Sequence, residues 1–283
     1  MVEASGLRRR AFAGRTLACL MLLFVSGPSL TGCSGRNTLT ADPVTIRISG
    51  STSMQPLLED LAAAYQQMHP SVSVEIRAGG SSAGLDEVRA GTADLAAVSW
   101  LAEGAEAGEG WQATPIARDG LAVIVHPSNA LPGLTILQVR SIYRGDMLDW
   151  GTVGGPKAEP LVISREDGSG DRLAFEALVM GEDQTTLGAL VMPSARAAAD
   201  YVAGHPLAIA YVSMSLLDDQ VRAVPVEGIP PVAESVRSGA YHLGRLLYLY
   251  GRDRASPHTQ DFVKFVLSPA GQAIVARHHM PLR

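Results

Sequence analysis

From Val44 onward, short β-rich runs alternate with segments of helical periodicity, and this alternation constrains the fold more than any other feature. The run "VTIRISG" leads into "PLLEDLAAAYQQMHP", where apolar residues recur at the 3.6-residue spacing of a helix. Further predicted strands are "VSVEIRAGG", "TADLAAVSW", "LAVIVHP", "PLVIS", "HPLAIAYVSM" and "RLLYLYGR". The pattern predicts an α/β fold whose mostly parallel sheets are flanked by helices.

The segment before this pattern has the features of an export signal. Its basic part contains Arg8, Arg9, Arg10 and Arg15. The apolar "TLACLMLLFVSG" follows, and it is shorter than the ~20 residues that a membrane-spanning helix needs. The segment ends in "LTGC", which resembles a bacterial lipobox. We therefore expect a lipoprotein signal peptide over 1–32, a lipidated Cys33 and a tether over 33–43. An ordinary signal peptide with an incidental cysteine is the alternative.

Cysteine usage and charge narrow the class of protein. The chain contains two cysteines, and removal of the signal would take Cys19 and leave Cys33 alone, so no internal disulfide is expected. The formal net charge of −5 argues against a nucleic-acid partner, for which a basic surface is typical. We expect a monomer in the cell envelope, on the periplasmic or extracellular face. Any site for an anion must then rely on local donors.

Three predicted strand-to-helix turns share one composition. They are the first turn, "GSTSMQP" (50–56), the second turn, "AGGSSAGL" (78–85), and the third turn, "REDGSGD" (165–171). Each offers serine hydroxyls and the unpaired N–H groups of a helix start, which together can hold an anion. Helix capping explains any single turn equally well. Three such turns at the carboxyl ends of strands favour a common anion site, with hydroxyls from Ser51, Thr52 and Ser53 in the first turn.

Two charged residues of the third turn would act on a bound anion in opposite ways, one by attraction and one by repulsion. Arg165 supplies a guanidinium that can hold two oxygens of a tetrahedral anion, unless it forms a salt bridge to Glu166 or Asp167. Asp171 would repel the same anion.

The segments "GSTSMQPL", "AGGSSAGL", "DGLAVIVHPSN" and "SREDGSGDRLAFE" resemble, in order and separation, the phosphate-binding lipoproteins that serve ABC importers. The resemblance runs from Val44 to the C-terminus. It implies a two-domain periplasmic-binding-protein type II fold that closes around its ligand by hinge motion about two strands. The implied domains are 44–122 plus 244–283, and 123–243. The implied partners are inorganic phosphate or a related oxyanion and an ABC permease complex, with no cofactor, no metal and no catalysis.

The resemblance also implies a set of ligand-binding residues. Carried over position by position, they are Thr52, Ser53, Ser81, Ser99, Arg165, Ser169, Gly170 and Asp171. Two of them depart from the family. Ser99 stands where many members carry an aspartate, and Asp171 stands where threonine is usual. A buried carboxylate that accepts the proton of phosphate disfavours sulfate, which carries none. The sequence therefore leaves three readings of Asp171: a relocated acceptor, a helix cap that faces away from the site, or the mark of a different ligand.

A serine hydrolase is the alternative from another functional class. "GSSAG" (80–84) fits the G-x-S-x-G pattern, with Ser82 as the nucleophile. Its acid would be Asp218 or Asp219, and its base His242 or His258. The motif comes too early in the chain for that fold and leaves the three similar turns unexplained. A protein that senses another oxyanion, such as sulfate or molybdate, is the remaining alternative.

Overall fold

The structure is a computed structural model that describes residues 44–101 and 108–282 of the 283-residue chain. The predicted export signal, the lipidation site at Cys33 and the tether lie outside the described residues. Among the described helices, none is both long enough and apolar enough to cross a membrane.

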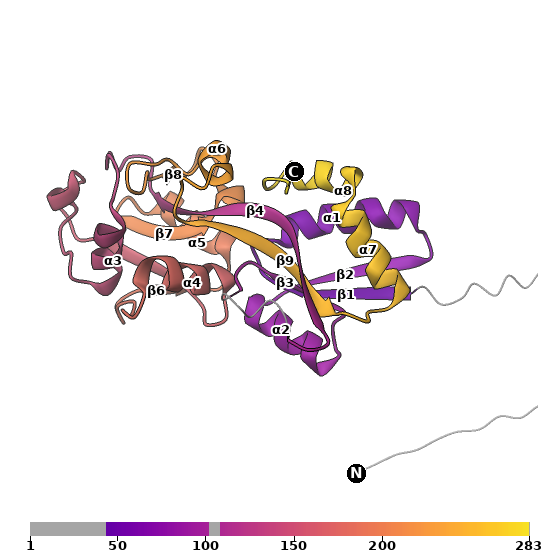
Figure 1. Cartoon of the computed structure of the whole chain (residues 1–283). Coiled ribbons are helices and arrows are strands. Elements are labelled where there is room, and N and C mark those ends of the chain that lie inside the picture. The colour runs from indigo at the N-terminus through magenta and orange to yellow at the C-terminus, as the bar shows by residue number, and fades with distance from the viewer. Residues whose placement is uncertain (1–43, 102–107, 283) are drawn as a thin grey trace, which may run out of the picture. The chain divides into compact units, whose positions relative to one another are not determined.

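The first five elements form a parallel group of strands covered by helices (Figure 1). They are β1 (Val44–Gly50), α1 (Gln55–Met68), β2 (Val72–Ala78), α2 (Ser81–Ala90) and β3 (Leu95–Val98). β1 lies between β2 and β3 and pairs with both in parallel register. α1 packs on this group because its apolar residues share one face. Its buried residues are Leu57, Leu58, Leu61, Ala62 and Tyr65. Parallel pairing places the first and second turns at the same edge of the sheet.

Two long strands connect this group to the rest of the sheet, as Figure 1 shows. β4 (Trp111–Val125) and β9 (Gly244–Arg252) pair with each other in antiparallel register, and β9 also pairs with β3. The last part of β4 pairs with β7 instead. The register of β4 against β9 shifts between Pro115 and Ala117, where a proline without an N–H interrupts the ladder. We call β4 and β9 the crossing strands.

The remaining elements gather around the second half of β4. In chain order they are α3 (Ile136–Arg144), η1 (Trp150–Val153), β5 (Leu161–Arg165), α4 (Gly170–Phe175), η2 (Glu176–Met180), β6 (Leu190–Met192), α5 (Ala195–Gly204), β7 (Ala208–Ser213), η3 (Met214–Leu216), β8 (Arg222–Ala223) and α6 (Ala233–Arg237). β5 pairs in parallel with β6 and β7. The stretch "GDRLAFEALVMG", predicted as one helix, is α4 followed by the π-helical turn η2. After β9, the helices α7 (Pro257–Leu267) and α8 (Pro269–Val275) pack against α1.

The predicted α/β class is confirmed, with the strand order β2-β1-β3-β9-β4-β7-β5-β6 and β8 paired to β4. One large hydrophobic cluster, which includes Ile46 and Leu57, lies around β1 to β3. Another, which includes Val123 and Phe175, lies around the second half of β4. Residues 40–283 nevertheless form one compact unit, so the boundaries of the two expected domains stay a prediction.

Candidate anion-binding site

The three turns predicted from the sequence meet one another in the structure. The Arg165 guanidinium of the third turn donates to Thr52 Oγ1 of the first turn, with an Nη2–Oγ1 distance of 3.1 Å. Between the same two turns, Ser53 Oγ donates to Asp171 Oδ1 at 3.3 Å. The second turn is joined to the third by the backbone N–H of Ser82, which donates to Gly168 O at 3.1 Å. Residues far apart in the sequence thus form one site.

Four buried serines from three segments form a hydroxyl cluster, consisting of Ser51, Ser53, Ser81 and Ser99. Ser51 Oγ donates to Ser99 Oγ at 2.9 Å and lies 2.9 Å from Ser53 Oγ. Ser81 Oγ accepts the backbone N–H of Ser99 at 3.2 Å. A hydroxyl can rotate to donate or accept, so this cluster can reorient toward an anion without moving its backbone.

Gly170, the first residue of α4, lies directly against this cluster. A Cβ atom at position 170 would collide with the hydroxyl oxygens of Ser81 and Ser99. Only glycine lets the start of α4 approach these two serines so closely. Ser169 caps α4 by accepting the N–H of Arg172 at 3.4 Å. The structure therefore brings Ser169 and Gly170 to the other predicted residues.

Helix capping does not explain the serines of the first two turns. No side chain caps α1 or α2, whose cap residues are Met54 and Gly80. Within the described residues, several backbone N–H groups of the turns have no acceptor, as expected at the start of a helix. They belong to Thr52, Ser53, Ser81, Gly170 and Asp171. Such N–H groups beside the hydroxyl cluster form a concentration of donors suited to an anion.

Arg165, at the end of β5, is almost completely buried, with 2% of its side chain exposed. Its Nη2 atom lies 2.8 Å from Glu166 Oε1, so the salt bridge to Glu166 considered from the sequence is present. Asp167 pairs with Arg172 instead. Arg165 Nε also donates to Met192 O at 3.2 Å, and the other contacts of the guanidinium reach Thr52 and Asp171. The guanidinium therefore faces the site and is held in place by Glu166 and a backbone carbonyl beside it.

Asp171 is also buried, with 2% of its side chain exposed. Its Oδ2 atom accepts from Arg165 Nη1 at 3.2 Å, and its Oδ1 atom accepts from Arg245 Nη2 at 2.6 Å. The side chain therefore points at the other site residues. The reading of Asp171 as a helix cap turned away from the site is wrong, because Ser169 is the cap and the Asp171 carboxylate lies between two arginines.

Arg245 is a site residue that the sequence analysis missed. It lies on β9 opposite Asp119 of β4, and its Nε and Nη2 atoms donate to Asp119 Oδ2 at 3.0 and 2.8 Å. We call Arg165, Asp171, Arg245 and Asp119 the ion-pair chain. The available signal was charge beside two buried strand runs, with Arg118 and Asp119 in "RDGLAVIV" and Arg245 in "GRLLYLY". Neither run identifies the partner of its charge, because the contact between them is set by the pairing of distant strands.

The electrostatics of the ion-pair chain follow from its burial. For Asp119, burial acts to raise the pKa, but the charges of Arg245 and His279 outweigh it and lower the pKa to about 2. For Arg245, burial acts to lower the pKa, but Asp171 and Asp119 outweigh it and raise the pKa. The charges of the two arginines balance those of the two aspartates, so the ion-pair chain is formally neutral.

The triad of the hydrolase alternative does not assemble among the described residues. The backbone N–H of Ser82 binds Gly168, whereas the Ser82 hydroxyl contacts no histidine. Asp218 pairs with Arg196, and neither His242 nor His258 contacts an aspartate. Within the same residues, no three histidine, cysteine, aspartate or glutamate side chains are grouped to hold a metal.

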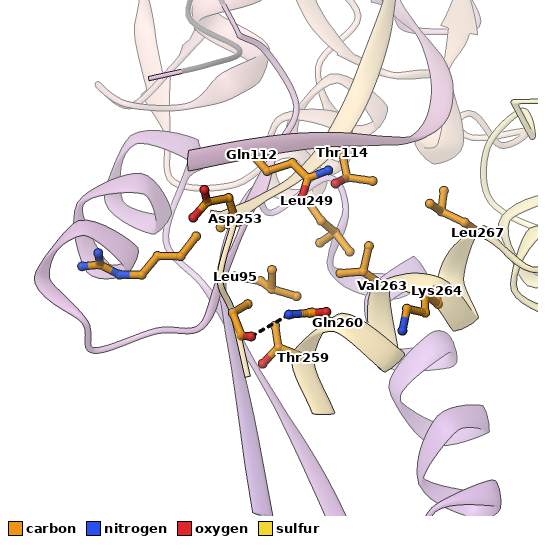
Figure 2. A pocket seen from close by; sticks show the side chains of 13 residues that line it. Leu95, Gln112, Thr114, Leu249, Asp253, Thr259, Gln260, Val263, Lys264 and Leu267 are labelled. Atoms are coloured by element: carbon orange, nitrogen blue, oxygen red, sulfur yellow. Dashed lines mark hydrogen bonds between the residues drawn. The ribbon is translucent and has the colours of Figure 1, made fainter. Parts of the chain in front are cut away.

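A separate cavity of about 280 Å³ lies between the ends of the crossing strands and α7 (Figure 2). Its apolar lining includes Leu249 and Val263, and its polar lining includes Lys264 and Gln260. Gln260 Nε2 donates to Ala255 O at 2.9 Å, as the dashed line in Figure 2 shows. None of the residues predicted for the anion site lines this cavity.

Comparison with known structures gives close matches over most of the chain. A Clostridium perfringens structure, described as a phosphate ABC transporter substrate-binding protein with bound phosphate, is 35% identical. It matches 84% of this chain and 100% of its own, with a TM-score of 0.81. A Vibrio cholerae structure, described as an ABC-type phosphate transport receptor, is 30% identical over 83% of this chain and 99% of its own, with a TM-score of 0.72.

Curated relatives agree with the structures. The phosphate-binding protein PstS of Bacillus subtilis is 26% identical over 226 residues, which are 79% of this chain and 75% of that protein. The protein of the same name from Pseudomonas aeruginosa is 28% identical over 265 residues, 82% of this chain and 81% of that protein. The family model described as a PBP superfamily domain matches residues 37–270. The family model and the shared fold show that the chain belongs to the PBP superfamily of binding proteins. This agrees with the periplasmic-binding-protein type II fold that the sequence resemblance implied.

Proposed function

We propose that this protein captures inorganic phosphate at the three turns and delivers it to an ABC importer. The observation that carries the proposal is the convergence of the hydroxyl cluster, the free N–H groups and Arg165 on one buried place. Charge-assisted hydrogen bonds contribute ~1.5 to 3 kcal/mol each, so several of them can replace the water around an oxyanion. The similarity to proteins described as phosphate-binding supports phosphate as the ligand.

The proposed ligand-binding residues are those brought together by the three turns and β3. They are Ser51, Thr52, Ser53, Ser81, Ser99, Arg165, Ser169, Gly170 and Asp171. No bond is made or broken in this function, and closure of two domains around the anion would make the loaded form recognisable to a transporter.

A panel of anions tests the ligand. We expect phosphate to bind in titration calorimetry and to raise the melting temperature more than sulfate, molybdate or tungstate between pH 5 and 8, with arsenate close to phosphate because of its shape and charge. The Arg165→Met variant should bind phosphate much more weakly, whereas Arg89→Gln, a change at an exposed side chain, should keep the wild-type affinity. A larger stabilisation by sulfate or molybdate would assign the protein to another oxyanion, and no heat with any of the anions would refute the proposal.

We also propose that the protein is a monomer anchored by lipid at Cys33 on the outer side of a cell membrane. The "LTGC" sequence before a polar tether supports this anchor. Metabolic labelling with a fatty acid should mark the wild type and leave Cys33→Ser unlabelled and shed into the medium or periplasm. Equal membrane retention of both proteins would contradict the anchor.

A further inference from the structure

The ion-pair chain places two further buried charges, Arg245 and Asp119, next to Asp171. At most 2% of the side chain of any of its four members is exposed. Removing one partner of a buried pair leaves the other charge uncompensated, which costs far more than the net value of the pair. Arg245 is the only member, among the residues the structure describes, that bonds to two aspartates at once.

The guanidinium geometry of Arg245 divides its donors between two sides. Nε and one hydrogen of Nη2 point to Asp119, and the other hydrogen of Nη2 points to Asp171. In a planar guanidinium, a hydrogen of Nη1 runs parallel to this last bond. Nη1 is buried and has no hydrogen-bond partner among the described residues. The side of the Arg245 guanidinium that does not bind Asp119 therefore faces Asp171. Asp171 also contacts Ser53 of the first turn.

We infer that Arg245 is a positioning residue of the anion site that acts through Asp171, a role that rests on the proposed function. It offsets the Asp171 charge so that a carboxylate can stand beside a bound oxyanion. With Arg245 present, the ion-pair chain is formally neutral. Without Arg245, the ion-pair chain carries a net negative charge beside the hydroxyl cluster. That charge repels a doubly charged anion more strongly than a singly charged one.

This role also accounts for the departure of Asp171 from the threonine usual at its position. A threonine needs no compensating charge, whereas a buried carboxylate needs one. Arg165 alone cannot supply it, because its Nε and Nη2 atoms are occupied by Glu166 at 2.9 and 2.8 Å. The second arginine makes the shorter contact to Asp171, at 2.6 Å against 3.2 Å for Arg165, and so supplies the larger share of the compensating charge.

A double-mutant cycle tests the inference in the full chain, with the phosphate dissociation constant as the readout. We expect Arg245→Gln to weaken phosphate binding about 100-fold, within the range for truncating one partner of a buried charge pair. In the Asp171→Asn background, the same change should cost only about 5-fold, because the charge to be compensated is gone. The loss in the single variant should be larger at pH 8 than at pH 6, where more phosphate is singly charged.

Arg245→Lys keeps the positive charge and serves as the conservative variant. It should recover most of the affinity lost in Arg245→Gln. If the glutamine variant does not fold, Arg245→Met removes the same charge and provides the cycle instead. Equal losses from Arg245→Gln in the wild-type and Asp171→Asn backgrounds, without dependence on pH, would overturn the inference and indicate a purely structural role or a direct contact. Absence of phosphate binding in the wild type would instead refute the proposed function.

Discussion

The hydroxyl cluster and the ion-pair chain meet at the same site, but different forces hold them. The hydroxyl cluster is neutral, comes mainly from the first group of strands, and consists of short side chains fixed by their turns. The ion-pair chain is charged and combines β5 and α4 with the crossing strands. The neutral part can adapt to a ligand by rotating hydroxyls. In the charged part, each guanidinium and carboxylate already has a partner, so a change of charge at one residue alters the interactions of the others.

The largest expected effect comes from the charged part. Arg165→Met removes the cation nearest the first turn and leaves Asp171 with one arginine. We expect phosphate affinity to fall about 1000-fold, at the upper end of the cost of breaking a buried charge pair. Titration calorimetry measures the loss, with Arg89→Gln as the surface control. A loss below ten-fold would show that the neutral donors bind the anion without help from this guanidinium.

A smaller loss should follow from blocking the contact between the two parts. Gly170→Ala places a methyl group on the hydroxyls of Ser81 and Ser99. We expect about 100-fold weaker binding, since overpacking costs about 1 to 3 kcal/mol. The matched control is Gly204→Ala, where a Cβ atom would meet nothing within 4 Å. If both alanine variants bind phosphate like the wild type, the start of α4 does not need to approach the serines.

Acid should weaken the charged part and spare the neutral part. The Asp119 pKa is lowered from its ordinary 3.8 to about 2, so its ion pair stabilises the fold fully above pH 4 and less as the pH falls toward 2. The difference corresponds to about 2 kcal/mol in the free energy of unfolding. Urea titrations between pH 6 and pH 2 should show this loss in the wild type and a weaker dependence in Asp119→Asn. Identical pH profiles would contradict the role of this carboxylate.

The smallest expected change concerns ligand selectivity. Many members of the family carry an aspartate where this chain has Ser99. If Asp171 accepts the phosphate proton in place of that aspartate, then Asp171→Asn should reduce the preference for phosphate over sulfate by about 10-fold. The control is Asp167→Asn in the same turn, whose side chain is 94% exposed. Competition between the two anions measures the ratio. An unchanged preference in Asp171→Asn would exclude a relocated acceptor.

Local sequence patterns were sufficient to predict the neutral part of the site. The serine-rich turns follow strands whose apolar runs are plain in the sequence, and parallel pairing brings the first two turns to one edge. The third turn follows β5, which pairs in parallel with β6 and β7 instead, so its contact with the first two turns depends on tertiary packing that no local pattern shows. The first half of β4 was not predicted, because Pro115 and the charged Arg118 and Asp119 interrupt its apolar pattern. The pairing of Asp119 with Arg245 was missed for a related reason. It depends on the register of two distant strands, and the paired residues are 126 positions apart in the chain.

Because Asp119 and Arg245 face each other across the ladder of the crossing strands, the electrostatic balance of the site is tied to the twist of that ladder. The irregularity near Pro115 lies only a few positions away on the same strand. We expect a substitution there to move the guanidinium relative to Asp171 while the serine-rich turns keep their sequence. On the proposed function, ligand preference would then depend on the backbone scaffold too, at positions that make no contact with the ligand.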